Sequence, residues 1–233
     1  MLLVSFLGGF IVPFTTGLLT YDMIQRGNDP STFTEYTGTV TFFFQLLIGT
    51  MLIGLLGTYS FHREFQEKTL KSYITIPVSR LVMFFSKQVV LLIWTLSIMA
   101  FVFLLSLGIA LPLGITNITF PGIIEYFWKI MAGGLFTLLG CLPIILLTII
   151  YRNYLVSIGV SIVITLVNTF VFRSKYITVF PWTSSIVIIN PGEWSDMTGA
   201  ALPVYTGWIS FGIMTGLSLI FALIYIRRME ITD

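Results

Sequence analysis

The sequence predicts an all-α membrane protein with six spanning helices, and three observations support this fold class. Charged residues make up 9% of the 233 positions, against about 25% in ordinary soluble domains. Apolar residues reach 56%. They gather in blocks of about 20 residues, which is enough for a helix to cross the hydrocarbon core of a bilayer. Such unbroken blocks exclude a β-barrel, whose strands alternate apolar and polar residues.

The first predicted span covers residues 2–20. Pro13 lies inside it and should kink the helix, and Thr15 or Thr16 can bond the carbonyl group that the proline frees. The segment has no basic residues at its start and no small-residue cleavage signature before Tyr21. We therefore expect a retained span and not a removable signal peptide.

The second and third predicted spans cover residues 37–61 and 88–111. A polar loop at 21–36, with a Gly-Asn-Asp-Pro turn, precedes the second span. Three glycines of that span are spaced so that another helix can approach closely. These are Gly49, Gly54 and Gly57.

The fourth and fifth predicted spans cover residues 128–151 and 154–172, and a tight turn joins them. Residues 112–127 precede the fourth span and contain two prolines and two glycines, which predicts an outer loop. Pro143 should kink the fourth span. Arg152 and Asn153 form the turn into the fifth.

An irregular segment at 173–203 precedes the last predicted span, residues 204–226. Its apolar part, residues 177–189, is about 13 residues long and is broken by Pro181, so it is too short to cross a bilayer. We expect an outer re-entrant segment here. The alternative, a seventh crossing, would carry Arg227 and Arg228 to the outside.

The distribution of basic residues favours six spans with both termini in the cytoplasm of a multi-pass plasma-membrane protein. This topology places eight basic residues inside and four outside. The inside set is Arg63, Lys68, Lys71, Arg80, Lys87, Arg152, Arg227 and Arg228. Residues 1–233 then form a single transmembrane domain.

Several kinds of chemistry lack the residues they need. The chain has one histidine, His62, and no His-Glu-x-x-His motif or phosphate-binding Gly-x-x-x-x-Gly-Lys-Ser/Thr motif. Cys141 is the only cysteine, so an internal disulfide is impossible and a thiolate metal site is not expected. The basic residues form no continuous stripe, which argues against a nucleic-acid partner. We expect no catalytic residue, metal or cofactor in this chain.

One charged segment, residues 62–80, interrupts the apolar blocks and is predicted to lie in the cytosol. Arg63, Glu64, Glu67, Lys68 and Lys71 fall at spacings of three and four residues, so they can pair along one face of a helix. Such a helix is either an ordinary solvated helix or a docking helix for a cytosolic partner.

The run Glu-Phe-Gln-Glu-Lys-Thr-Leu-Lys-Ser-Tyr-Ile-Thr-Ile-Pro-Val-Ser-Arg at 64–80, followed by Lys87, resembles the cytosolic loop of ABC-2 type transporter permeases. The bacitracin and lantibiotic self-immunity permeases are the most similar subgroup. The resemblance implies a coupling helix seated in a groove of a separate ATPase subunit, which binds ATP and magnesium. It assigns contact with that subunit to Arg63, Glu64, Glu67, Thr69, Leu70, Pro77 and Arg80.

The same resemblance implies a second permease chain, identical or related, and export of an amphipathic peptide antibiotic, a lipid or a hydrophobic drug from the lipid bilayer. The chain departs from the family pattern at its start, where relatives usually carry a basic amphipathic helix. We therefore expect that it begins later than its relatives. The alternative function is a non-transporting membrane immunity or sensor protein that binds a peptide or a regulator. For a third function, a membrane-embedded enzyme, the sequence offers no set of candidate catalytic residues.

Overall fold

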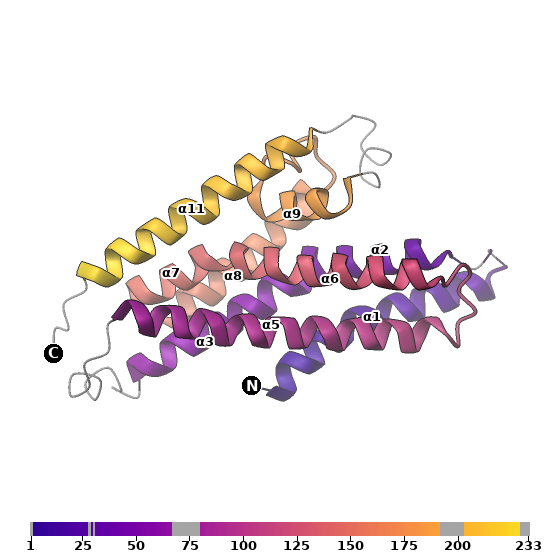
Figure 1. The fold of residues 1–233 in the computed structure, drawn as a ribbon, viewed down its shortest axis with the longest axis horizontal. Coiled ribbons are helices and arrows are strands. Elements are labelled where there is room, and N and C mark those ends of the chain that lie inside the picture. Colours follow the sequence, from indigo (N-terminus) through magenta and orange to yellow (C-terminus); the bar gives the residue numbers. More distant parts are fainter. Residues whose placement is uncertain (1, 28, 30, 67–79, 192–202, 229–233) are drawn as a thin grey trace.

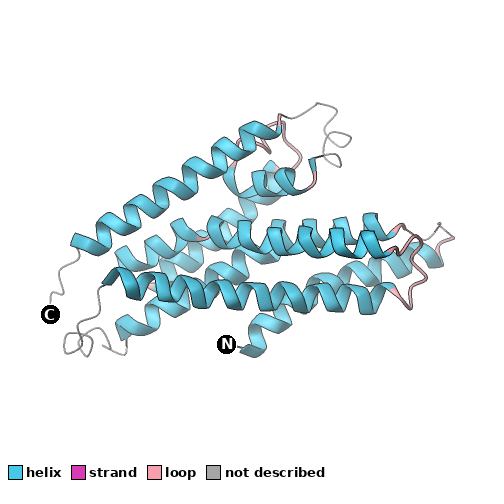
Figure 2. Ribbon diagram, in the orientation of Figure 1, coloured by secondary structure: helices cyan, strands magenta, loops and turns pink. Residues whose placement is uncertain are grey.

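The computed structural model describes residues 2–27, 29, 31–66, 80–191 and 203–228, and it folds them almost entirely into helices (Figures 1 and 2). Within these residues there is no β-strand, only an isolated bridge between Thr32 and Thr116. Six helical segments of the described chain are long and apolar enough to cross a membrane. The predicted all-α, six-helix fold class is confirmed.

Two of the six crossing segments are built from more than one helix. The helices are α1 (Leu2–Gln25), α2 (Phe33–Phe43), the π-helix η1 (Phe44–Gly49), α3 (Thr50–Gln66), α5 (Arg80–Ala110), α6 (Phe120–Gly140), α7 (Leu142–Tyr151), α8 (Tyr154–Val171), α9 (Pro181–Ile189) and α11 (Val204–Arg228). The second crossing runs continuously through α2, η1 and α3, and the fourth runs through α6 and α7.

The helices at the α1–α2 connection run further than the sequence predicted. α1 continues to Gln25 because Asp22, in its last turn, pairs with Arg26 at 2.7 Å. α2 begins at Phe33, not at residue 37, because Thr32 and Glu35 form a capping box: the Thr32 hydroxyl accepts from the Glu35 amide, and the Glu35 carboxylate accepts from the Thr32 amide. The predicted polar loop at 21–36 is correspondingly short.

Two other helices start earlier than the predicted spans, because a polar residue and a proline were taken as signs of a boundary or a loop. α5 begins at Arg80 and not at residue 88, because Lys87 stays helical while its ammonium group donates to the Ser60 carbonyl and lies over the Phe61 ring. α6 begins at Phe120 and not at residue 128. Pro121 stands in its first turn, where a proline costs no hydrogen bond. Much of the predicted outer loop at 112–127 is therefore helix.

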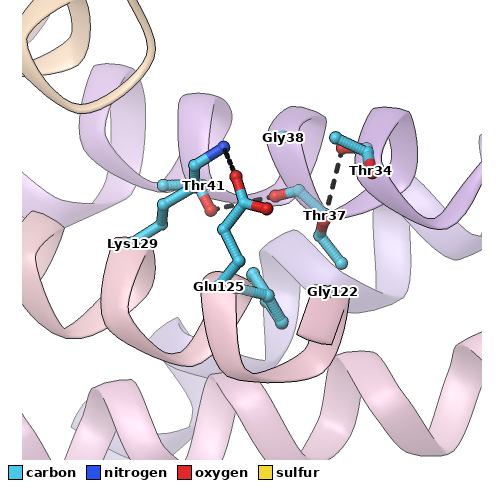
Figure 3. A pocket seen from close by; sticks show the side chains of 8 residues that line it. Thr34, Thr37, Gly38, Thr41, Gly122, Glu125 and Lys129 are labelled. Atoms are coloured by element: carbon cyan, nitrogen blue, oxygen red, sulfur yellow. Dashed lines mark hydrogen bonds and ion pairs between the residues drawn. The ribbon is translucent and has the colours of Figure 1, made fainter. Parts of the chain in front are cut away.

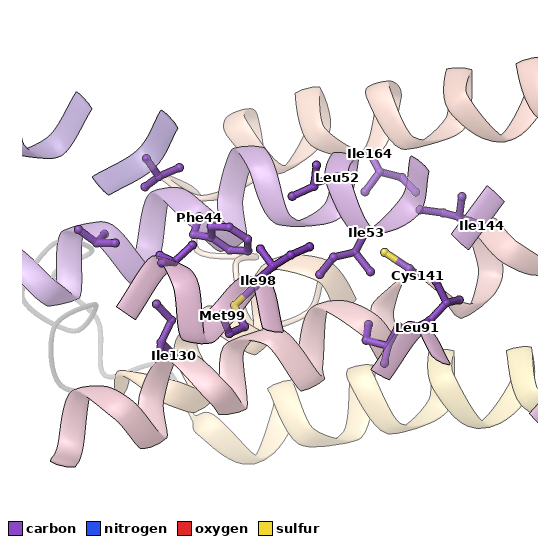
Figure 4. Close-up of a cluster of buried hydrophobic side chains, with 14 of the residues drawn as sticks. Phe44, Leu52, Ile53, Leu91, Ile98, Met99, Ile130, Cys141, Ile144 and Ile164 are labelled. Carbon is purple, nitrogen blue, oxygen red and sulfur yellow. The ribbon is translucent and has the colours of Figure 1, made fainter. Parts of the chain in front are cut away.

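The second and fourth crossings form the centre of the bundle. Their most apolar stretches are 67% and 61% buried, whereas those of the last two crossings are 22% buried. Around this centre α1 packs on α5, α8 packs on α3, and α11 packs on α9 and α7. Ile53, Ile98, Ile130 and Ile144 lie in the buried cluster where the central helices meet (Figure 4).

The irregular segment before the last crossing contains α9, which has nine residues and is too short to cross a bilayer. A second apolar cluster holds α9 against the bundle. It comprises Leu46, Ile177, Ile186 and Val187, with Phe42, Leu47, Phe172 and Val204 packed around them. Residues 192–202 of this predicted segment lie outside the described residues.

Candidate functional site

The end of the bundle where α3 stops and α5 starts, here called the α3–α5 end, carries the predicted coupling residues that the structure describes (Figure 1). Arg63 is exposed in the last turns of α3, Glu64 belongs to the same helix, and Arg80 is the first residue of α5. Glu67, Thr69, Leu70 and Pro77 lie outside the described residues. The coupling role of this set stays a prediction.

A cavity of about 390 Å³ opens between α1, α3 and α8 toward this end of the bundle. We call it the α1–α3–α8 groove. Apolar side chains form most of its walls, namely Val4, Leu52, Leu55, Leu56 and Ile158. Its polar residues are Ser5, Thr58, Tyr59, His62 and Tyr154. Its volume falls within the range of small-molecule pockets, about 300–1,000 Å³.

His62 is a groove residue whose side chain forms no hydrogen bond within the described chain. Its ring lies 5.0 Å from the ring of Tyr154, centroid to centroid. Both imidazole nitrogens are buried and lack a hydrogen-bond partner within the described residues. A neutral imidazole has one donor and one acceptor. The groove therefore offers apolar walls with the His62 ring among them, and both nitrogens of that ring are buried in this conformation.

Buried hydroxyl groups fix the helices that form the groove. Thr148 Oγ1 of α7 lies 2.7 Å from Ser157 Oγ of α8 and 3.3 Å from Thr58 Oγ1 of α3. The Trp94 indole of α5 donates to Ser5 Oγ of α1 at 3.2 Å. These contacts join α3 and α8 through α7, and α1 to α5, and lipid offers them no competing hydrogen-bond partners.

Sequence reasoning did not find this groove. It placed His62 only as the first residue of the charged segment 62–80 and Tyr154 only as the start of a span. The two residues lie far apart in the chain, and neither sits in a recognisable motif. Only the packing of α8 against α3 brings them together.

A polar slot between α2 and α6, away from the α3–α5 end, is too small to be a ligand site (Figure 3). Its cavity volume is about 10 Å³, which leaves room for a single water molecule at most. Lys129 pairs with Glu125 at 2.7 Å across its rim. Thr37 and Thr41 bond carbonyl groups of their own helix.

The described residues contain no group of three or more histidine, cysteine, aspartate or glutamate side chains that could hold a metal ion. Cys141 is a buried free thiol inside the central cluster. Of the groove and the polar slot, only the groove has room for a small molecule.

Comparison with known proteins shows which family the sequence resembles. The sequence model of a family described as "ABC-2 family transporter protein" matches residues 1–168. The bacitracin transport permease protein BCRB of Bacillus licheniformis is 32% identical over 205 residues, which cover 87% of this chain and 95% of that protein. No solved structure matches the chain significantly.

Proposed function

The chain belongs to the ABC-2 family of transporter permeases, and from this membership we propose that it is the membrane-spanning subunit of an exporter driven by a separate ATPase. The proposed substrate is an amphipathic peptide antibiotic, ahead of a lipid or a hydrophobic drug. The likeness to a bacitracin permease over almost the whole of both chains carries this proposal.

The proposed assembly contains a second permease chain, identical or related, and ATPase subunits that bind ATP and magnesium. Residues 62–80 dock on the ATPase from the cytosol, and both chain termini lie on the same side of the plasma membrane. α3 leads directly from this docking segment to the groove, since it supplies Leu52, Leu55, Leu56, Thr58, Tyr59 and His62. Movement of the ATPase subunits would tilt α3 and change the shape of the groove.

The coupling role predicts a loss of ATPase binding when the acidic residues of the docking segment are removed. We expect the double variant Glu64→Ala, Glu67→Ala to recover at least tenfold less ATPase on co-purification than the wild type. Antibiotic tolerance should fall in parallel. The cause is the loss of charged contacts from a small docking helix, where a few residues carry most of the binding energy.

The control variant Asp22→Ala, Glu125→Ala also removes two carboxylates, both from exposed pairs spaced by four residues in other helices. It should retain ATPase binding and tolerance. Undiminished binding in the docking-segment variant would refute the coupling role. Tolerance conferred by the permease with no ATPase present would establish the alternative, a membrane immunity or sensor protein.

Filling the groove should block transport without unfolding the chain. Ile158 is a half-buried wall residue, and a tryptophan in its place would occupy much of the space that the substrate needs. We expect Ile158→Trp to lower antibiotic tolerance at least tenfold while ATPase co-purification is kept. Tolerance is measured as the minimal inhibitory concentration in cells that express both subunits.

The matched control is Ile162→Trp, one helical turn further along α8, where the side chain is 41% exposed and outside the groove. This variant should behave as the wild type. Equal tolerance of the two tryptophan variants would exclude the groove as part of the substrate path.

A further inference from the structure

A π-helix interrupts the second crossing near its middle. The six residues of η1, Phe44–Gly49, lie inside the continuous helical segment Phe33–Arg63. The wide π turn brings the Phe44 carbonyl oxygen to 2.9 Å from where a Cβ atom at position 49 would be, so only glycine fits there. π turns within α-helices are rare and occur frequently at functional sites.

A break in the fourth crossing lies against the end of this π-helix. α6 stops at Gly140 and α7 starts at Leu142, with Cys141 between them and Pro143 in the first turn of α7. The Cys141 thiol lies 3.7 Å from the carbonyl oxygen of Thr50, the first residue after η1. The two central crossings are therefore both irregular at the point where they meet.

Side chains from two other elements donate to carbonyl groups at these irregular points. The Asn168 amide of α8 donates to the Leu46 carbonyl in η1 at 3.4 Å. The Trp182 indole of α9 donates to the Gly140 carbonyl at 2.9 Å. Such bonds satisfy backbone groups that a discontinuous helix leaves open inside a membrane, so the helices can stay irregular there.

Gln45 in η1 has no hydrogen-bond partner among the described residues. Its side chain is 4% exposed, and both atoms of its amide are buried without a hydrogen bond in the described chain. It lies against Gly133 of α6, where an added Cβ atom would overlap the Gln45 nitrogen. A buried unpaired amide is costly and rare in native proteins. A conformation that gave the Gln45 amide a hydrogen bond would remove this local cost.

η1 also connects two parts of the fold. Through Leu46 it packs on Ile186 and Val187 of α9, and through α3 it continues to the α3–α5 end. A change in the η1 turn would therefore alter both its contact with α9 and the start of α3.

We propose that residues 44–49 switch between a π turn and an α turn during transport, and that this switch passes movement of α3 to α9. The proposal rests on the proposed transport function, because the switch would occur during the transport cycle. Both turns would nevertheless be accessible to the permease without its ATPase. The change from a π turn to an α turn shortens the turn by one residue, which passes into the neighbouring helix. The preceding helix therefore rotates by about 100°. This rotation would carry the Gln45 amide away from Gly133, where it is unpaired within the described residues.

Two substitutions bias the switch in opposite directions. Gln45→Leu removes the unpaired amide and favours the π form, whereas Gly49→Ala places a methyl group against the Phe44 carbonyl and favours the α form. Gly108→Ala is the control, since a Cβ atom there meets nothing within 4 Å.

The experiment uses purified permease in lipid nanodiscs, with a cysteine in place of Tyr176, which is 59% exposed close before α9. Cys141 is fully buried, so an environment-sensitive fluorophore attaches to the new cysteine alone. We expect Gln45→Leu to raise the melting temperature by about 3–6 °C. We expect the emission of Gly49→Ala to differ from that of Gln45→Leu, and the control to match the wild type.

These measurements need neither ATPase nor substrate, so they separate the switch from the proposed function. Identical emission from the two variants, or a lower melting temperature for Gln45→Leu, would overturn the switch. With the ATPase present, both variants should keep its binding and lose at least tenfold in antibiotic tolerance. Full antibiotic tolerance in cells with Gln45→Leu would also overturn the proposal. If the variants differ in emission but the wild type transports nothing, the switch is supported and only the proposed function is refuted.

Discussion

Replacing Tyr126 by alanine is expected to lower the free energy of unfolding by about 3 kcal/mol. The Tyr126 side chain is 2% exposed. Its ring packs edge-on against Phe33 of α2 and tilted against Phe103 of α5, and its hydroxyl donates to Ser106 at 2.9 Å. Alanine leaves a cavity where three helices meet. The value is taken at the low end for buried aromatics because packing, and not transfer from water, supplies most of the energy inside a membrane.

A graded series separates the ring from the hydroxyl. Tyr126→Phe should cost about 1 kcal/mol, because it leaves the Ser106 hydroxyl without this partner. Tyr36→Phe should cost nothing or stabilise the protein, since the buried Tyr36 hydroxyl has no partner in the described chain. Phe120→Ala, at a 75% exposed position of the same helix α6, is the control. Unfolding in mixed micelles measures all four, and equal losses for Tyr126→Phe and Tyr126→Ala would contradict the packing argument.

The number of crossing segments was predictable because it depends on composition and length alone. Any block of about 20 apolar residues must become a helix in lipid, where each backbone group needs an internal partner. The helix starts were less predictable because they depend on local contacts. Lys87 lies within a helix while the Ser60 carbonyl of another helix accepts a hydrogen bond from its ammonium group, and Pro121 reads as a loop residue unless Thr119 is recognised as the cap of α6.

The groove and the irregular centre of the bundle could not be predicted, because their residues give no local signal. Gln45 looks like a single polar residue in an apolar run, and nothing in its neighbours predicts a π turn. Its burial follows from Gly133, which lies in another helix far along the chain. In the same way, the position of His62 beside the Tyr154 ring depends on a residue far along the chain.

The docking segment shows the opposite case. Its charges and their spacing predict a helix with one charged face, the resemblance to permease loops adds the docking role, and the structure shows which helices flank the segment. α3 enters it from the second crossing, the most buried of the six, and α5 leaves it. α3 also lines part of the groove and follows directly on η1. The second crossing therefore contributes residues to the proposed docking segment, to the groove and to the proposed switch.

Replacing Gly57 by leucine should have the largest effect on folding, because α3 and α7 touch at this position. A Cβ atom at residue 57 would lie 2.8 and 2.9 Å from two side-chain carbons of Ile145. Leucine adds further atoms to this contact and separates the helices, which also breaks the neighbouring contact between Thr58 and Thr148. We expect a loss of about 3 kcal/mol or more and aggregation on size-exclusion chromatography. Gly108→Leu, in open space, should elute as the wild type; a monodisperse, equally stable Gly57→Leu would mean that α3 and α7 do not pack as described.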